Sequence, residues 1–155
     1  MNYELGIMKN LRLFSLILLV GTLSFAQALG FSVFGIKPNL ALIAVIAGFF
    51  FISSFWEGFL LTAIAALILK FSPVFEPEIL IFSLIGVGAL IVKNYLPWRN
   101  FLNSLFLIGL AVFTFYLFLA PKLIYSFIFL KELALSLILG TLLFALLSFL
   151  RQNKT

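Results

Sequence analysis

The stretch SSFWEGFLL (residues 53–61) places one carboxylate, Glu57, inside a long apolar tract. Glu57 is the only charged side chain between Pro38 and Leu69. A single helix from Leu40 to Leu69 would be about 45 Å long, whereas the hydrocarbon core of a bilayer is about 30 Å thick. A tilt beyond about 40° would be needed to absorb the difference. The stretch therefore predicts two shorter helices joined by a turn.

The residues around Glu57 suit a turn at the membrane surface. Ser53 and Ser54 can bond local backbone groups, Trp56 favours the interface, and Gly58 relaxes the turn. We predict that Glu57 reaches water at this apex. Two alternatives stay open: a single bent helix through the same residues, and a carboxylate buried in the membrane, which would be functional by default.

The composition indicates a membrane protein along the whole chain. Of the 155 residues, 65% are hydrophobic and 10% are charged, whereas soluble domains average about 45–50% apolar and about 25% charged residues. We predict an all-α membrane protein, a single polytopic domain over residues 1–155, with about six transmembrane helices and a short helical hairpin at spans two and three. The predicted spans are roughly 13–35, 39–55, 58–71, 78–95, 101–120 and 132–150.

Two segments between the predicted spans have their own expected structure. In EPE (residues 76–78), Pro77 suits the first helical position, and Glu78 would lie at the positive end of the helix dipole. The segment PKLIYSFIFLK (residues 121–131) is apolar but too short to span. We expect it to lie along the interface, with its two lysines directed toward the headgroups.

The basic residues predict the orientation. With six spans, one side of the membrane carries both termini and six of the ten Lys and Arg residues, and the other side carries four. The positive-inside rule then places both termini in the cytoplasm. The AQA sequence (residues 26–28) resembles a signal-peptide cleavage site, but the apolar run continues to Ile36 and is long enough to span. We therefore expect residues 1–28 to be retained, with the first span continuing past this site to residue 35.

Small residues recur at helical spacing on two neighbouring spans. Gly58, Thr62 and Ala66 are four residues apart on the third span. Small side chains allow helix backbones to approach closely in lipid, so we predict helix packing through this face. On the second span, the corresponding small residues are Ala41, Ala44, Ala47 and Gly48.

Polar residues inside the spans are few. Gln27 is expected to make an interhelical hydrogen bond, and Asn103, Ser104 and Thr114 are interpreted in the same way rather than as a substrate path. The GVGAL sequence (residues 86–90) predicts a close helix contact, with a flexible break of the kind found at transporter ligand sites as the alternative.

The residue inventory narrows the chemistry. The chain has no Cys, His or Asp, which removes disulfides, thiol nucleophiles, His-dependent triads and the usual zinc ligands. We predict that the protein is not an enzyme and has no catalytic, metal or cofactor-binding residues. The net charge of +5 is explained by membrane orientation, because no long basic run indicates nucleic-acid binding.

The order of segments resembles the MreD family of rod-shape-determining bacterial membrane proteins. The resemblance is carried by KPNLALIAVIAGFF (residues 37–50) and GFLLTAIAALILKFSP (residues 58–73). It covers most of the chain in layout and is strongest over residues 37–75. The family often has an acidic residue late in the third helix and a glycine in its middle, where this chain has Ala66 and Thr62.

This resemblance implies a non-enzymatic integral membrane scaffold of the cell-elongation and cell-shape machinery, which directs peptidoglycan synthesis. Such a protein lies in the bacterial cytoplasmic membrane, in contact with membrane lipids, with the partner MreC and, indirectly, with MreB. An alternative of similar size is the substrate-binding membrane subunit of a vitamin or metal transporter, which needs a cavity with convergent polar groups. A holin-like membrane-perturbing protein is a third class, usually with fewer spans.

Overall fold

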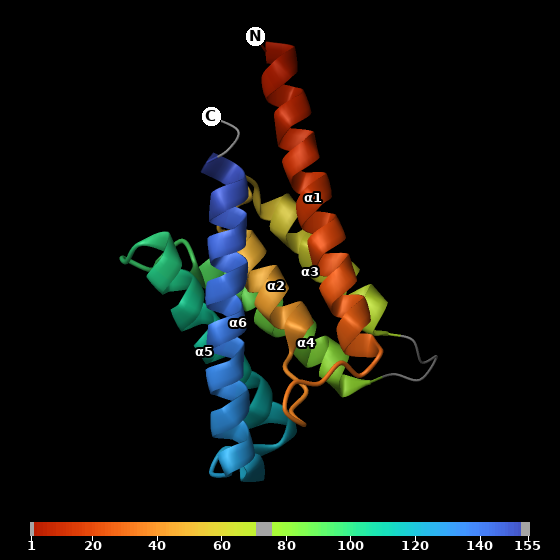
Figure 1. Ribbon diagram of the computed structural model, residues 1–155, viewed down its shortest axis with the longest axis vertical. Coiled ribbons are helices and arrows are strands. Elements are labelled where there is room, and N and C mark those ends of the chain that lie inside the picture. Colours follow the sequence, from red (N-terminus) through yellow and green to blue (C-terminus); the bar gives the residue numbers. More distant parts are fainter. Residues whose placement is uncertain (1, 71–75, 153–155) are drawn as a thin grey trace.

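The computed structural model describes residues 2–70 and 76–152, with side chains described for residues 10–70 and 76–150. Within these ranges the chain is all-helical and contains no strand, as predicted (Figure 1). The helices are α1 (Asn2–Ala28), α2 (Leu40–Phe49), α3 (Phe55–Leu69), α4 (Pro77–Val92), α5 (Asn100–Leu119), the 3-10 helix η1 (Pro121–Leu123) and α6 (Phe127–Gln152).

Three helices are long and apolar enough to cross a membrane. They are the Asn10–Ala28 part of α1, the whole of α5, and the Phe127–Leu150 part of α6. The helices α2, α3 and α4 have 10, 15 and 16 residues, fewer than the minimum of about 17 for a full span. Six full-length spans are therefore not supported by the described residues, which contain three.

The first predicted span is wrong at its C-terminal end, because α1 stops at Ala28 rather than at residue 35. The chain then enters left-handed backbone at Gly30, Phe34 and Gly35, with φ values of 81°, 52° and 76°. Glycine adopts this conformation without a steric penalty, and it cannot continue a right-handed helix. A tight turn results, in which the backbones of Val33 and Ile36 exchange two hydrogen bonds of 2.8 and 3.0 Å.

Other boundaries also differ from the predicted ones. The helix α2 ends at Phe49 instead of residue 55, and the predicted third span reaches position 71, which lies outside the described residues. The interfacial segment 121–131 is wrong from residue 127 onward, because α6 begins there. Ser126 explains this start, since its hydroxyl accepts a hydrogen bond from the Phe129 N–H at 3.3 Å. The EPE prediction is confirmed: α4 starts at Pro77, with Glu78 in its first turn.

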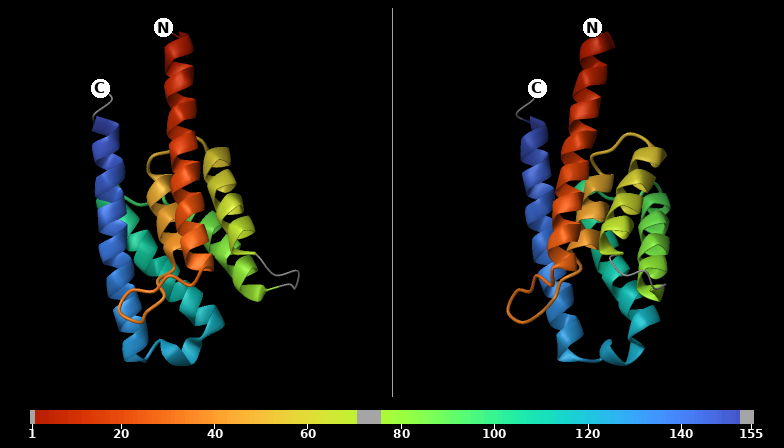
Figure 2. Two further views of the ribbon diagram at one scale, coloured as in Figure 1. Left: turned by 45° about the vertical axis from the view of Figure 1, so that its right-hand side comes forward. Right: turned by 90° about the vertical axis from the view of Figure 1, so that its right-hand side faces the viewer.

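The short helix α2 is the core of the bundle. It contacts each of the other five α-helices, and all ten of its residues are buried. The helices α1, α3, α4, α5 and α6 follow one another around it (Figure 2). Ala41, Ala44, Ala47 and Gly48 make this possible, because their small side chains let several helices approach the α2 backbone at once.

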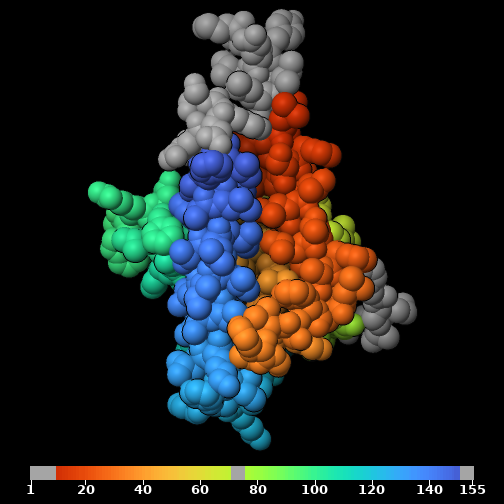
Figure 3. Space-filling view, in the orientation of Figure 1, coloured from red at the N-terminus to blue at the C-terminus, as the bar shows by residue number. Residues whose placement is uncertain are grey.

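The outer faces of the long helices are apolar and exposed. Leu18 of α1, Phe118 of α5 and Phe149 of α6 are each at least 60% exposed. Figure 3 shows α1 and α6 as the ridges of one face of the molecule. Such surfaces are compatible with a membrane protein, whose large apolar side chains contact lipid. The start of α1, the end of α6 and the α2–α3 turn lie at the same end of the bundle (Figure 1).

Candidate functional site

Glu57 organises the turn between α2 and α3. Ser54 is the N-cap of α3, and its hydroxyl accepts a hydrogen bond from the Trp56 N–H at 3.2 Å. One Glu57 carboxylate oxygen, Oε2, accepts from the N–H groups of Ser53 (2.9 Å) and Ser54 (3.3 Å). This reciprocal arrangement is a capping box, which satisfies backbone donors at a helix start. Glu57, half-exposed, thus stabilises the first turn of α3.

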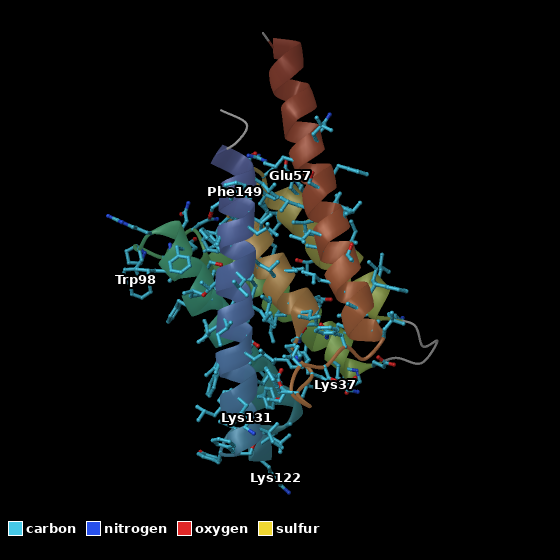
Figure 4. All side chains as sticks on the ribbon, viewed as in Figure 1. Lys37, Glu57, Trp98, Lys122, Lys131 and Phe149 are labelled. Carbon is cyan, nitrogen blue, oxygen red and sulfur yellow. The ribbon has the colours of Figure 1, made fainter. Side chains whose placement is uncertain are left out.

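Two basic residues tie this turn to other helices. The Arg12 guanidinium of α1 donates a 2.7 Å hydrogen bond to the Ser53 hydroxyl, and the Lys93 ammonium donates a 2.7 Å bond to the Phe49 carbonyl. Lys93 follows the last residue of α4. Burial lowers the pKa of its ammonium group, and the Glu57 carboxylate only partly offsets this effect. We call Arg12, Ser53, Glu57 and Lys93 the apex cluster (Glu57 is labelled in Figure 4). The sequence patterns missed both basic partners.

The small-residue face of α3 packs against α4 at Gly58 and Thr62. A Cβ atom added at Gly58 would lie 2.5 Å from Leu90 Cδ1 of α4. One turn later, a Cβ added at Gly86 of α4 would lie 2.6 Å from Thr62 Cγ2. Each glycine therefore receives a side chain of the facing helix, which brings the two backbones close together. Ala66, the third residue of this face, is partly buried against the core.

The small residues of α2 serve other neighbours. Ala44 is fully buried in the core. A Cβ atom at Gly48 would lie 3.5 Å from Leu61 of α3 and 3.9 Å from Leu16 of α1, which are ordinary van der Waals distances. Gly48 of α2 therefore lies between α3 and α1 and contacts both.

The predicted polar residues have different outcomes. Gln27 makes the expected interhelical bond, because its Oε1 accepts from the Ala41 N–H at 2.8 Å. Asn103 does not link two helices; its side-chain amide donates to the Leu96 and Trp98 carbonyls at 3.3 and 2.9 Å and holds the loop before α5. Thr114 donates to a carbonyl of its own helix. The buried Ser104 hydroxyl has no hydrogen-bond partner within the described residues.

A buried polar pair between α5 and α6 was not predicted from the sequence. The Tyr116 hydroxyl donates to Oε2 of Glu132, which is only 8% exposed. One turn further along α6, the fully buried Ser136 hydroxyl has no partner in the part of the chain that the structure describes. Recognition of Ser126 as a helix cap would have placed Glu132 inside α6 and implied a buried donor for it.

An apolar groove of about 330 Å³ runs between α4 and α5. Thr114 is the only hydroxyl-bearing residue in its lining, and that hydroxyl is already bonded to the Leu110 carbonyl at 2.7 Å. The helix α4 passes through residues 86–90 without interruption, so the GVGAL segment is a packing element and not a helix break. Gly86 contacts α3, whereas Gly88 lines the groove.

The described residues contain no group of three or more Cys, His, Asp or Glu side chains that could hold a metal ion. The charged groups of the apex cluster make hydrogen bonds with backbone atoms and with the Ser53 hydroxyl. No known family model, curated protein or solved structure matches this chain.

Proposed function

We propose that this protein is a non-enzymatic scaffold of the bacterial cell-elongation and cell-shape machinery, which holds other membrane proteins through its outward helix faces. The observation that carries the proposal is the closely packed bundle around α2, whose outer helices present large apolar side chains. The segment order, which resembles the MreD family, supplies the link to cell shape. MreC is the expected direct partner, and MreB the indirect one.

The hydroxyl groups of the helices support a scaffold over a transport subunit. Six of them donate to a carbonyl four residues earlier in their own helix, at 2.6–3.0 Å. A hydroxyl that is bonded to its own backbone is not available to a ligand, and a ligand site requires polar groups that converge. These hydroxyls belong to Ser15, Thr22, Thr62, Ser83, Thr114 and Thr141.

We further propose that α2, α3 and α4 lie at membrane depth, in the cytoplasmic membrane, with both termini in the cytoplasm. The helix α2 supports this arrangement because it contacts α1, α5 and α6, the three helices long enough to span. The start of α1, the end of α6 and the α2–α3 turn lie at the same end of the bundle, which supports an even number of crossings. Under the predicted topology, six of the ten Lys and Arg residues belong to the side of the two termini, which supports a cytoplasmic placement of that side.

One observation favours the alternative of a transporter subunit. The Glu132–Tyr116 pair is an ionisable contact between two membrane-length helices, and such groups often mark ion or substrate paths. Under this alternative, a Glu132→Gln variant would lose uptake of a vitamin or metal ion. Under the scaffold proposal, that variant would affect only the stability of the bundle.

Photo-crosslinking in the native membrane tests the scaffold. A photoreactive residue at Leu142, which is 61% exposed on α6, is expected to form an adduct with a membrane protein of the elongation machinery. The same residue at Ile43, fully buried in α2, is the control and should give no adduct with another protein. If deletion of the gene leaves cell shape unchanged and exposed positions capture no protein, the proposal fails.

A further inference from the structure

The groove between α4 and α5 has an unfilled glycine at its centre. A Cβ atom added at Gly58, Gly86 or Gly140 would meet a neighbouring side chain within 2.5–2.6 Å, but one added at Gly88 would have nothing within 4 Å. The first three glycines are therefore closed by helix contacts within the chain. Gly88 instead leaves a groove open to the surroundings, beside a helix long enough to span a membrane.

The groove has the length of one lipid leaflet. On α4, its lining includes Leu84, Gly88 and Val92, which are four residues apart and form one row along the helix. On α5, the lining extends from Leu107 to Phe118, about 16 Å at 1.5 Å per residue. Half of the hydrocarbon core of a bilayer is about 15 Å thick. An extended hydrocarbon chain of a lipid therefore matches the groove along its length.

The lining predicts a ligand portion without polar atoms. The only hydroxyl in the groove, that of Thr114, already donates to the Leu110 carbonyl. The volume of about 330 Å³ is at the lower end of the range of about 300–1,000 Å³ for ligand pockets. Hydrocarbon satisfies such a lining, whereas a polar metabolite would lose hydrogen bonds to water without replacement.

The loop at the Val92 end of the groove adds a positive charge. Arg99 is exposed, and within the described part of the chain its guanidinium has no hydrogen bond or ion pair. No acidic residue occurs from Ile79 to Lys131, so no carboxylate of this segment competes for it. Trp98 beside it is half-exposed and packs edge-on against Phe106, at 5.4 Å between ring centroids (Figure 4). An arginine with an adjacent tryptophan is suited to lipid headgroups.

We propose that the α4–α5 groove binds one acyl chain of an anionic phospholipid, whose phosphate group is held by Arg99. The apolar groove selects the hydrocarbon, and the unpaired guanidinium selects the negative headgroup. The alternative occupant of the groove, a helix of another protein, is an outcome of the test. This site is independent of the scaffold proposal, because lipid binding and partner binding are measured separately.

Tryptophan quenching by brominated lipids tests the site in the full chain. Trp56 and Trp98 are the only tryptophans, so a Trp56→Phe background leaves Trp98 as the reporter beside Arg99. The protein is reconstituted in phosphatidylcholine vesicles that contain brominated phosphatidylglycerol or brominated phosphatidylcholine. We expect an association constant about five-fold higher for the anionic lipid, as one basic residue near the surface provides.

Three variants separate the contributions. Arg99→Gln should reduce the ratio of the association constants for the anionic and the neutral lipid to about one. Lys122→Gln removes the same charge from an exposed position outside this loop and should leave this ratio unchanged. Gly88→Leu fills the groove and should reduce quenching by both brominated lipids, and the smaller Gly88→Ala should do so in part. Equal quenching by the two lipids in the parent protein, or an unaltered preference in Arg99→Gln, would overturn the proposal. A photoreactive residue at position 88 that captures a protein instead of lipid would also overturn it.

Discussion

Replacing Gly58 with alanine is expected to destabilise the bundle, whereas the same replacement at Gly88 should stabilise it. A Cβ atom at position 58 would lie 2.5 and 2.8 Å from the two terminal methyl carbons of Leu90, and 2.8 Å from Ile52 Cδ1. Leu90 is 1% exposed, so a rotation that moves one methyl group away has no open space to enter. Overpacking typically costs about 1–3 kcal/mol, and alanine returns about 0.5–1 kcal/mol of helix propensity. The net loss in free energy of unfolding is between about 0 and 2.5 kcal/mol.

Gly88 is the matched control for this loss. Both glycines are within helices, but a Cβ atom at position 88 would meet nothing within 4 Å. Gly88→Ala should therefore keep the whole propensity gain of about 0.5–1 kcal/mol. A double-mutant cycle locates the strain. Leu90→Ala removes two of the three obstructing methyl groups and leaves space into which Ile52 Cδ1 can shift, so Gly58→Ala should cost less in that background. The expected coupling between positions 58 and 90 is about 1–2 kcal/mol.

Unfolding of the detergent-solubilised protein by sodium dodecyl sulfate, followed by tryptophan fluorescence, measures these differences. The reasoning is refuted if Gly58→Ala and Gly88→Ala have the same free energy of unfolding. It is also refuted if the effects of Gly58→Ala and Leu90→Ala simply add, because the strain would then arise from another contact.

Three further substitutions test the polar contacts with the same unfolding measurement. Glu57→Ala should lower the free energy of unfolding by about 1 kcal/mol through loss of the cap, whereas Glu57→Gln should cost less because its amide oxygen still accepts; equal losses would exclude the capping role. Tyr116→Phe should cost about 1–3 kcal/mol because it leaves Glu132 without its donor, and an unchanged stability would mean that water replaces the hydroxyl. Gln27→Leu should cost about 1 kcal/mol by freeing the Ala41 N–H, and a stabilised variant would contradict this bond.

Local features of the fold are predictable from the sequence where a short pattern has a single structural meaning. Pro77 after Glu76 starts a helix because proline fixes φ and lacks the N–H that a helix start leaves unpaired. The spacing of Ser54 and Glu57 is that of a capping box, which explains why the apolar tract divides near Glu57. The tight turn after α1 was missed because Gly30 lies in an apolar run whose composition alone resembles a continuing span.

Helix neighbours are not predictable in the same way. The helix α2 is apolar on every side, so its sequence periodicity does not indicate which face meets which helix. Gly58 and Gly88 have the same chemistry, but one is filled by Leu90 and the other lines a groove. In lipid, an apolar side chain gains little free energy when it contacts protein instead of hydrocarbon. Which helices pack together therefore depends on shape complementarity between segments distant in the sequence.

Three polar side chains of the bundle acquire a common role once α2 is recognised as a short, buried central helix. Its terminal N–H and C=O groups have no partner within the helix and cannot reach bulk water. Gln27 bonds to the Ala41 N–H, the Asn39 side chain bonds to the Leu42 N–H at 3.2 Å, and Lys93 bonds to the Phe49 carbonyl. Three side chains from three parts of the chain therefore cap the two ends of one helix. Capping the core helix, rather than binding a ligand, accounts for these polar groups, in agreement with the proposed scaffold.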